Sequence, residues 1–237
     1  MGRAYEVRKA SIQKNGAVKA KLYSNFAKEI FIVAKKGGVN PDSNINLKRL
    51  IDKAKKEQVP NDIIKRAIDK AKGNTNDNYE EIIYEGFGPG ASTFIIKTLT
   101  DNVNRTVGEV RAAFNKVNKS LGVTNSVSYN YDYLTILSFK ADNGEEIFEA
   151  LLNEGIELID FEDDKEITVS CNPMDAHKVK DVLEKIIPNI DYIFDETGMF
   201  AKDEVTLSEE DKIVYDKLYN MLNNIDDVTA IYTNVKL

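Results

Sequence analysis

The stretch YEGFGPGASTFIIKTLTDNVNRTVGEVRAAF, residues 84–114, decides the fold because its pattern contains a turn, a strand, a polar loop and a helix. Three glycines, at positions 86, 88 and 90, combine with Pro89 to supply positive φ angles and one fixed φ, which predicts a sharp turn. Residues 91–100 are rich in β-branched and aromatic side chains, and this composition predicts a buried strand.

A helix is predicted after this strand, beginning at Val107. Asn102, Asn104 and Thr106 each offer an oxygen that can cap a helix, and Thr106 and Glu109 have the spacing of a capping box. The predicted apolar face of the helix consists of Val107, Val110, Ala113 and Phe114.

The chain before this stretch predicts a bundle of three basic helices. Apolar side chains recur at helical spacing in residues 22–33, 47–54 and 63–71. Asn40 and Pro41 predict the cap and the first residue of the second helix. Short links between the helices are typical of a small bundle.

The chain after this stretch predicts a mixed and acidic region. Residues 126–131 alternate as a strand, and residues 132–203 predict the order β-α-β-β-α-β, the split βαβ arrangement. Asn172 and Pro173 predict the start of its second helix. The first helix of this region is predicted to form around Ile147, Phe148, Leu151 and Leu152.

The last residues predict a helix capped by Ser208 and a strand at 228–235, which together are too small for a separate domain. We therefore expect them to complete the sheet that begins at residues 80–131. The predicted fold is α+β with three domains: a basic three-helix bundle at 1–76 that begins with an irregular arm at 1–18, a discontinuous α/β domain at 77–131 and 204–237, and an inserted acidic, ferredoxin-like α/β domain at 132–203. The final helix is predicted to direct Ile213, Val214, Leu218 and Leu222 inward.

Composition restricts the functional classes. The 237 residues are 42% hydrophobic and 30% charged, and the absence of a long apolar run predicts a cytoplasmic protein without a membrane segment. The single Cys171 excludes an internal disulfide, and Cys171 with the single His177 leaves little for zinc binding or acid–base catalysis. The acidic run 161–166 favours a solvated turn over a divalent-ion site. We therefore predict no enzyme activity and no cofactor.

Charge is distributed unevenly along the chain. The formal net charge is −7, but residues 1–73 hold 18 Lys and Arg against 7 Asp and Glu, a balance of +11. Residues 132–203 hold 6 basic against 19 acidic residues, a balance of −13. This asymmetry predicts that one end of the chain binds a polyanion, although a Lys-rich helix face is also compatible with simple solvation.

The predicted nucleic-acid contacts share a cationic side chain on a polar helix face or at a helix start. They are Lys19, Lys21, Lys28, Lys35, Lys36, Lys48, Arg49, Lys55, Lys56, Lys65, Arg66 and Arg105. For Arg105, a phosphate or partner contact and a local ion pair remain open alternatives.

Two further patterns have simpler interpretations than a binding site. The glycines at 86, 88 and 90 have the wrong spacing for a dinucleotide site, and a strand follows them. Tyr129, Tyr131 and Tyr133 alternate as they do in single-strand binders that stack bases, but packing in a half-buried strand is the simpler interpretation.

The sequence resembles the YebC/PmpR family, and its local sequence is closest to the YeeN-like branch. This family includes the mitochondrial translational activator of cytochrome oxidase subunit one. The resemblance covers nearly the whole chain. It rests most on three segments: Tyr84 to Gly90, Leu99 to Thr106, and Gly122 with Ser126 and Val127.

The resemblance implies three domains around a central cleft and two alternative functions. The first is a DNA-binding transcriptional regulator. The second is a ribosome-associated translation factor that binds ribosomal RNA and contacts ribosomal proteins. We expect a nucleic acid as partner in either case. The sequence does not predict the oligomeric state or the target.

Overall fold

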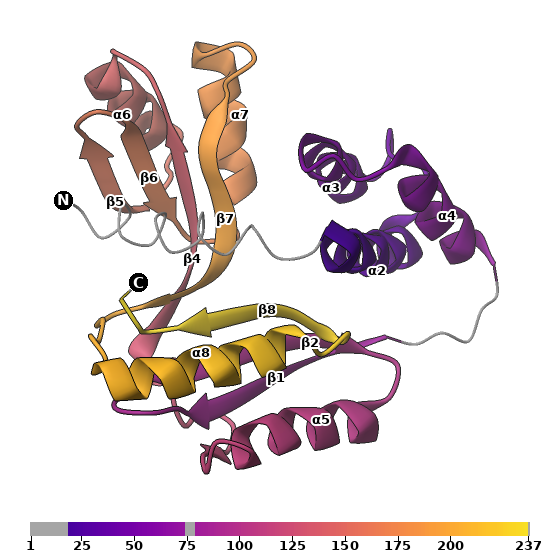
Figure 1. Ribbon diagram of the computed structural model, residues 1–237. Coiled ribbons are helices and arrows are strands. Elements are labelled where there is room, and N and C mark those ends of the chain that lie inside the picture. Colours follow the sequence, from indigo (N-terminus) through magenta and orange to yellow (C-terminus); the bar gives the residue numbers. More distant parts are fainter. Residues whose placement is uncertain (1–18, 74–78, 237) are drawn as a thin grey trace.

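The computed structural model describes residues 19–73 and 79–236. Two segments lie outside this part of the chain: the predicted arm at residues 1–18, and residues 74–78, which follow the helical bundle. Figure 1 shows a mixed α+β molecule with a helical group on one side and two separate sheets. This architecture confirms the predicted fold class, whereas the exact domain boundaries stay a prediction.

The helical domain consists of α2 (Lys19–Gly37), α3 (Ile45–Lys56) and α4 (Asn61–Lys72). Its core contains Phe26 and Ile30 of α2, Leu47 of α3 and Ile64 of α4. These residues belong to the predicted apolar stripes, so hydrophobic burial explains why the helices pack together.

The start of α3 differs from the prediction. Asn44 caps the helix, because its side-chain oxygen accepts a hydrogen bond from the Leu47 backbone N–H at 3.1 Å. Asn40 instead accepts from the backbone N–H of Asp42, which makes a turn before the helix. Both asparagines suit a cap, and the one nearer the apolar stripe is used.

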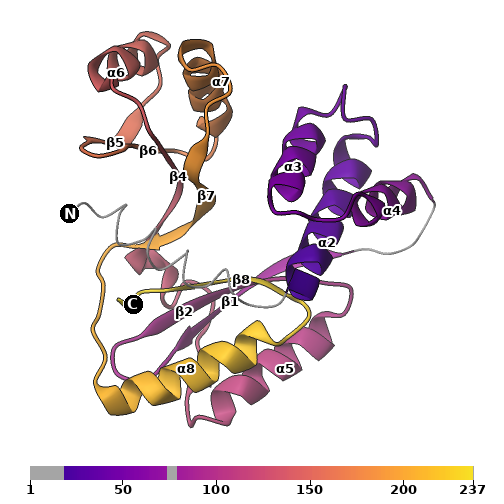
Figure 2. The same cartoon turned by 45° about the horizontal axis from the view of Figure 1, so that its top comes forward.

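The middle domain contains the sheet β3-β1-β2-β8, in which all neighbours are antiparallel. Its strands are β1 (Glu80–Phe87), β2 (Thr93–Thr100), β3 (Ser120–Leu121) and β8 (Val228–Thr233). Two helices, α5 (Val103–Asn115) and α8 (Glu209–Asn223), lie side by side on one face of this sheet (Figure 2). The final strand therefore pairs with the buried central strand β2.

The core of the middle domain lies between the sheet and the two helices. Phe94 contacts Phe114 edge-on at 5.9 Å and Tyr215 at 5.3 Å between ring centroids. Gly86 is required by packing, because a Cβ there would lie 2.5 Å from the Phe114 ring. Only Gly90 of the three glycines in the turn has a positive φ, at 58°.

The acidic domain contains the sheet β5-β6-β4-β7, which is also antiparallel. Its elements are β4 (Tyr131–Phe139), α6 (Gly144–Asn153), β5 (Leu158–Asp163), β6 (Ile167–Cys171), α7 (Ala176–Ile186) and β7 (Tyr192–Ala201). This order confirms the predicted β-α-β-β-α-β arrangement. The core includes Leu137, Phe139, Ile147, Leu151, Val179 and Leu183.

Several local predictions were wrong. Helix α5 begins at Val103, after the cap Asn102, and not at Val107. Helix α7 begins at Ala176, after a turn at residues 172–175, and not at Pro173. Residues 126–130 form a turn and a short 3-10 helix, η1 (Ser128–Asn130), before β4 begins. Phe148, Leu152 and Ile213 are exposed instead of inward, and Tyr215 occupies the core position on α8.

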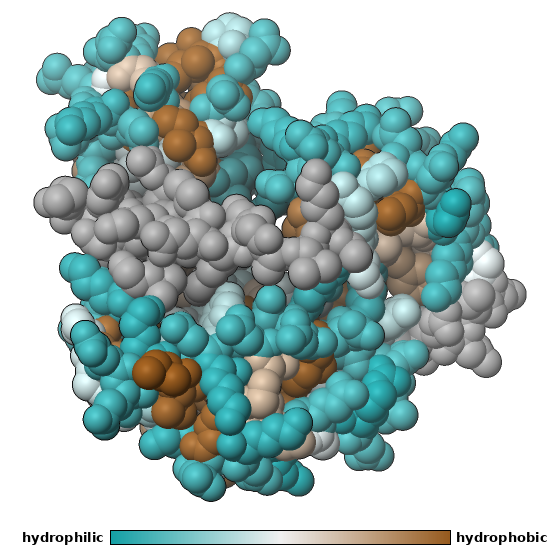
Figure 3. Space-filling model, viewed as in Figure 1, coloured by the Kyte–Doolittle hydropathy of each residue, from teal (hydrophilic) through white to brown (hydrophobic). Residues whose placement is uncertain are grey.

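Within the described ranges, no helix combines the length and the apolar character that crossing a membrane requires. The face of the molecule in Figure 3 is mostly hydrophilic, and its hydrophobic residues form small separate patches.

Candidate nucleic-acid interface

The predicted cationic residues fall into three groups. One group is exposed on the helical domain, where α2 ends and along α3 and α4, as the sequence pattern suggested. We define the basic face as Lys36, Lys48, Lys55, Lys65 and Arg66. Lys35 is also exposed and lies 5.4 Å from the centre of the Phe31 ring. Lys19 belongs to α2, but its side chain lies outside the described part.

A second group anchors α2 to the middle domain. The Lys21 ammonium donates hydrogen bonds to the carbonyl oxygens of Asn223 and, at 3.1 Å, Ile225. Asn223 is the last residue of α8 and Ile225 follows its cap, so Lys21 lies where the helix dipole is negative and favours a cation. Burial lowers the pKa of Lys21 to about 8, although the nearby Asp226 carboxylate opposes this change.

Asp227 is the centre of this anchor. Its Oδ2 lies 2.6 Å from Arg105 Nη2, 2.8 Å from the Thr106 hydroxyl and 3.0 Å from the Thr100 hydroxyl. Its Oδ1 accepts a hydrogen bond from Lys28 Nζ at 3.2 Å. One buried carboxylate thus joins the helical domain to the ends of β2 and β8 and to the first turn of α5.

These contacts set the ionisation of the cluster. Burial alone would raise the pKa of Asp227, but the hydrogen bonds from Arg105, Thr106, Lys28 and Thr100 lower it to about 2. The pKa of Arg105 is raised by its hydrogen bonds to Asp227 and Asp101, so its guanidinium stays charged. Lys21, Lys28 and Arg105 are therefore committed to internal partners in this structure.

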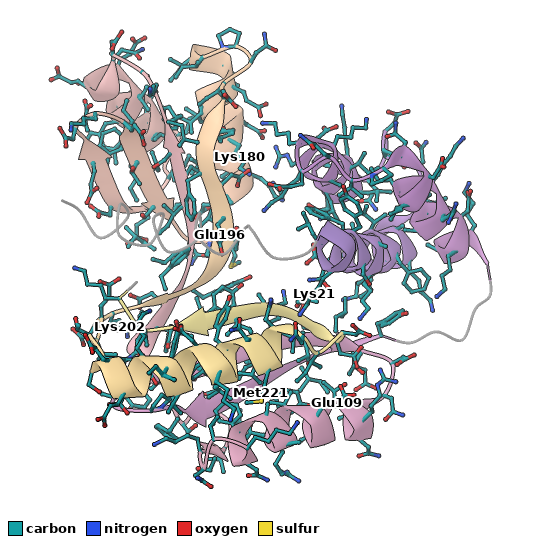
Figure 4. The ribbon with its side chains drawn as sticks, viewed as in Figure 1. Lys21, Glu109, Lys180, Glu196, Lys202 and Met221 are labelled. Carbon is teal, nitrogen blue, oxygen red and sulfur yellow. The ribbon has the colours of Figure 1, made fainter. Side chains whose placement is uncertain are left out.

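A pocket of about 790 Å³ lies beside the cluster, between α2, α5 and α8. Figure 4 labels Lys21, Glu109 and Met221, which come from these three helices and line the pocket. The lining combines three cationic side chains with the carboxylates of Asp101, Glu109, Asp226 and Asp227. Its charges largely neutralise one another, so the pocket does not favour a polyanion.

The third group contacts the acidic domain. Arg49 Nη2 lies 2.7 Å from Asp181 Oδ1 on α7, and Lys56 Nζ lies 5.9 Å from the centre of the Tyr192 ring on β7. Lys53, between them on α3, donates to the Asp195 carbonyl at 3.3 Å. Arg49 is therefore partly buried, whereas Lys53 and Lys56 are exposed like Lys48 and Lys55.

The carboxylates that bind the predicted cations were not among the predicted site residues. Asp227 and Asp181 lie more than a hundred residues from Arg105 and Arg49, so no local pattern pairs them. A third carboxylate, Glu85, accepts hydrogen bonds from the backbone N–H groups of Asn125, Val127 and Ser128 at 2.8, 2.7 and 2.9 Å. Burial raises the pKa of Glu85, and these bonds more than offset it, so the net pKa is lowered.

These carboxylates give a structural role to the segments on which the family resemblance rests. Glu85 fixes the loop that contains Val127, and Asp227 holds Thr100, Arg105 and Thr106. The segments Tyr84 to Gly90 and Leu99 to Thr106 therefore stabilise the middle domain in this structure.

Other candidate residues have ordinary surroundings. Burial raises the pKa of the Cys171 thiol to about 11, which disfavours a reactive thiolate. His177 is exposed, and its Nε2 lies 3.0 Å from Asn46 Oδ1 on α3. Tyr131 is buried, and its hydroxyl lies 2.7 Å from the Thr93 hydroxyl, whereas Tyr129 and Tyr133 are exposed. Among the described residues, no group of His, Cys, Asp or Glu could hold a metal ion.

Comparisons with known proteins match the whole described chain. A family described as TACO1/YebC protein N-terminal domain matches residues 3–74, and one described as TACO1/YebC second and third domain matches residues 79–235. Two similar proteins are both named probable transcriptional regulatory protein. The protein from Alteromonas mediterranea is 41% identical over 235 residues, 99% of this chain and 98% of the relative. The protein from Chromohalobacter salexigens is 42% identical over 238 residues, 100% of this chain and 99% of the relative.

A solved structure has the same fold. The crystal structure of a conserved hypothetical protein from Aquifex aeolicus is 31% identical and has a TM-score of 0.74, covering 92% of this chain and 90% of that chain. The two family matches together cover residues 3–74 and 79–235, and each relative covers nearly the whole chain. The chain therefore belongs to the TACO1/YebC family.

Proposed function

We propose that this chain is a regulatory protein that binds nucleic acid through the basic face of its helical domain, and that the nucleic acid is DNA. The observation that carries this proposal is the exposure of Lys36, Lys48, Lys55, Lys65 and Arg66 on one small domain with a balance of +11. Such side chains repel one another unless an anion lies nearby, and neutralising phosphates releases counterions.

The composition of the basic face favours contacts with phosphate over reading of bases. Lysine provides a point charge for phosphate, whereas base recognition relies mainly on Arg, Asn and Gln in the major groove. We therefore expect binding that depends steeply on salt and only modestly on sequence. The name shared by the two relatives, probable transcriptional regulatory protein, favours DNA as the target.

A second candidate is a ribosome-associated translation factor, and the surface of the acidic domain favours it. Phe148 and Leu152 are exposed on α6 beside the exposed carboxylates of Glu145 and Glu149, and Ile159 is exposed on β5. Apolar side chains among carboxylates suit a basic protein better than a polyanion. In this alternative the basic face binds ribosomal RNA and the acidic domain contacts ribosomal proteins.

The test compares wild type with the triple variant Lys55→Glu, Lys65→Glu, Arg66→Glu in gel shifts with promoter DNA and with ribosomal RNA fragments. The matched control is Arg111→Glu, Lys116→Glu, Lys217→Glu, which makes the same charge change on exposed positions of the middle domain. We expect only the first variant to lose binding. Equal binding by both variants would contradict the claim that nucleic acid binds through the basic face.

The same proteins distinguish the two candidates. Preference among promoter fragments, with wild type at the top of a low-salt sucrose gradient, supports the DNA function and excludes the ribosome. Co-sedimentation with ribosomal subunits, together with no preference among promoter fragments, excludes transcriptional regulation and supports the translation factor.

A further inference from the structure

Helix α3 carries basic residues on two faces. Lys48 and Lys55 are seven residues apart and therefore lie on the same side of the helix. Arg49, Lys53 and Lys56 follow at intervals of four and three, and they form a second row. We call this second row the covered row because each of its side chains contacts the acidic domain, although Lys53 and Lys56 stay exposed to solvent.

Each residue of the covered row contacts the acidic domain. Arg49 forms an ion pair with Asp181 at 2.7 Å, and Lys53 donates to the Asp195 carbonyl at 3.3 Å. Lys56 lies over the Tyr192 ring. In both Figure 1 and Figure 2, α7 and β7 face α3 across this contact. A phosphate backbone bound at α3 would compete with the acidic domain for these cationic groups.

The hydrogen bonding at this contact is incomplete, which does not suit a permanent interface. Within the described part of the chain, Arg49 Nη1 and the Tyr192 hydroxyl are buried and have no hydrogen-bond partner. Burying a polar group without a partner is unfavourable, and water would satisfy both groups if the domains separated. The ion pair itself is partly exposed, with Arg49 at 28% and Asp181 at 58%, so it contributes little.

We propose that the acidic domain is an internal competitor for the nucleic acid. In the closed form described above, α7 and β7 withhold the covered row, and nucleic acid uses this row only after the acidic domain has moved away. This inference rests on the proposed function and adds its regulation. The apparent dissociation constant then equals the intrinsic constant divided by the fraction of open molecules, so weaker closure means tighter binding.

The first test weakens the closed contact without changing a predicted nucleic-acid contact. Asp181→Asn removes the negative charge that pairs with Arg49, and we expect DNA or RNA to bind about two- to fivefold more tightly, as a surface ion pair allows. The matched control is Glu149→Gln, which removes one negative charge from the exposed side of α6. Equal tightening in both variants would indicate only a change in net charge and would contradict the competition.

The second test locks the closed form. The double variant Asn46→Cys, His177→Cys places one thiol on each side of the contact between these native side chains, and a disulfide-containing bismaleimide bridges the gap between them. The native Cys171 is buried and does not compete for the reagent. We expect the linked protein to bind roughly tenfold more weakly, since three phosphate contacts are unavailable. Reductive cleavage of the linker restores binding.

The outcomes separate this inference from the proposed function. If linked and cleaved proteins bind equally tightly, the acidic domain does not compete, although the basic face stands. If neither the cleaved protein nor wild type binds any nucleic acid, the proposed function fails and the competition fails with it.

Discussion

The helical domain touches the rest of the chain at two places that differ in burial. Against the middle domain, Lys28 contacts Asp227, whose side chain is only 7% exposed. Against the acidic domain, Arg49 contacts Asp181, and these side chains are 28% and 58% exposed. The first contact continues into a network with Thr100, Arg105 and Thr106. The second is a row of separate contacts.

This difference indicates which joint can move. Breaking a buried ion network leaves an unpaired charge in a poorly solvated place, which is strongly unfavourable. Breaking an exposed pair releases two side chains into water at little cost in free energy. The helical domain is therefore held more firmly by the middle domain than by the acidic domain.

The largest expected effect comes from removing the centre of the buried network. Asp227→Ala leaves Lys28 and Arg105 without their shared carboxylate, and we expect it to lower the free energy of unfolding by about 3 kcal/mol. Urea unfolding measures this change. Asp226→Ala removes an exposed neighbour and should change stability by less than about 1 kcal/mol. Equal losses in both variants would show that the network is not a special anchor.

A somewhat smaller effect is expected on acidification. The pKa of Asp227 is about 2 in the folded protein, below the ordinary value of 3.8. Its stabilisation is therefore complete above pH 4 and is lost as the pH falls toward 2, an effect of about 2 kcal/mol. We expect the stability difference between wild type and Asp227→Asn to shrink by this amount between pH 6 and pH 2. A difference independent of pH would contradict the depressed pKa.

The smallest effect is expected at the exposed contact. Asp181→Asn should change the free energy of unfolding by less than about 1 kcal/mol, because the pair is partly solvated and Asp181 is exposed. Its effect should instead appear in domain separation, measured as a larger radius of gyration in solution scattering. A loss of stability as large as that of Asp227→Ala would make the two joints equivalent and would remove the basis for the comparison.

Much of the fold followed from local patterns. The turn and the buried strand of residues 84–100 were predictable because Gly, Pro and β-branched residues act locally. The predicted helix starts were less accurate, since Asn40 and Asn44 both suit a cap and only packing selects between them. Ile213 fits a helical stripe but is exposed, because the sheet meets the side of α8 that carries Tyr215.

The candidate site was predictable only in part. Local charge identified the helical domain as basic, and exposed positions such as Lys55 and Lys65 were among the predicted residues. Sequence alone did not separate these from Lys28, Arg49 and Arg105, because their acidic partners come from distant parts of the chain. Such long-range pairs depend on tertiary structure, and a single sequence contains no local signal for them.

The most direct test of the central claim is the salt dependence of nucleic-acid binding. The logarithm of the observed binding constant for a duplex DNA is measured against the logarithm of salt concentration for wild type and for Lys55→Glu, Lys65→Glu, Arg66→Glu. If these residues contact phosphates, the slope should fall in magnitude by about 1 for each lost contact. An unchanged slope and an unchanged affinity would contradict the claim that the basic face binds the phosphate backbone.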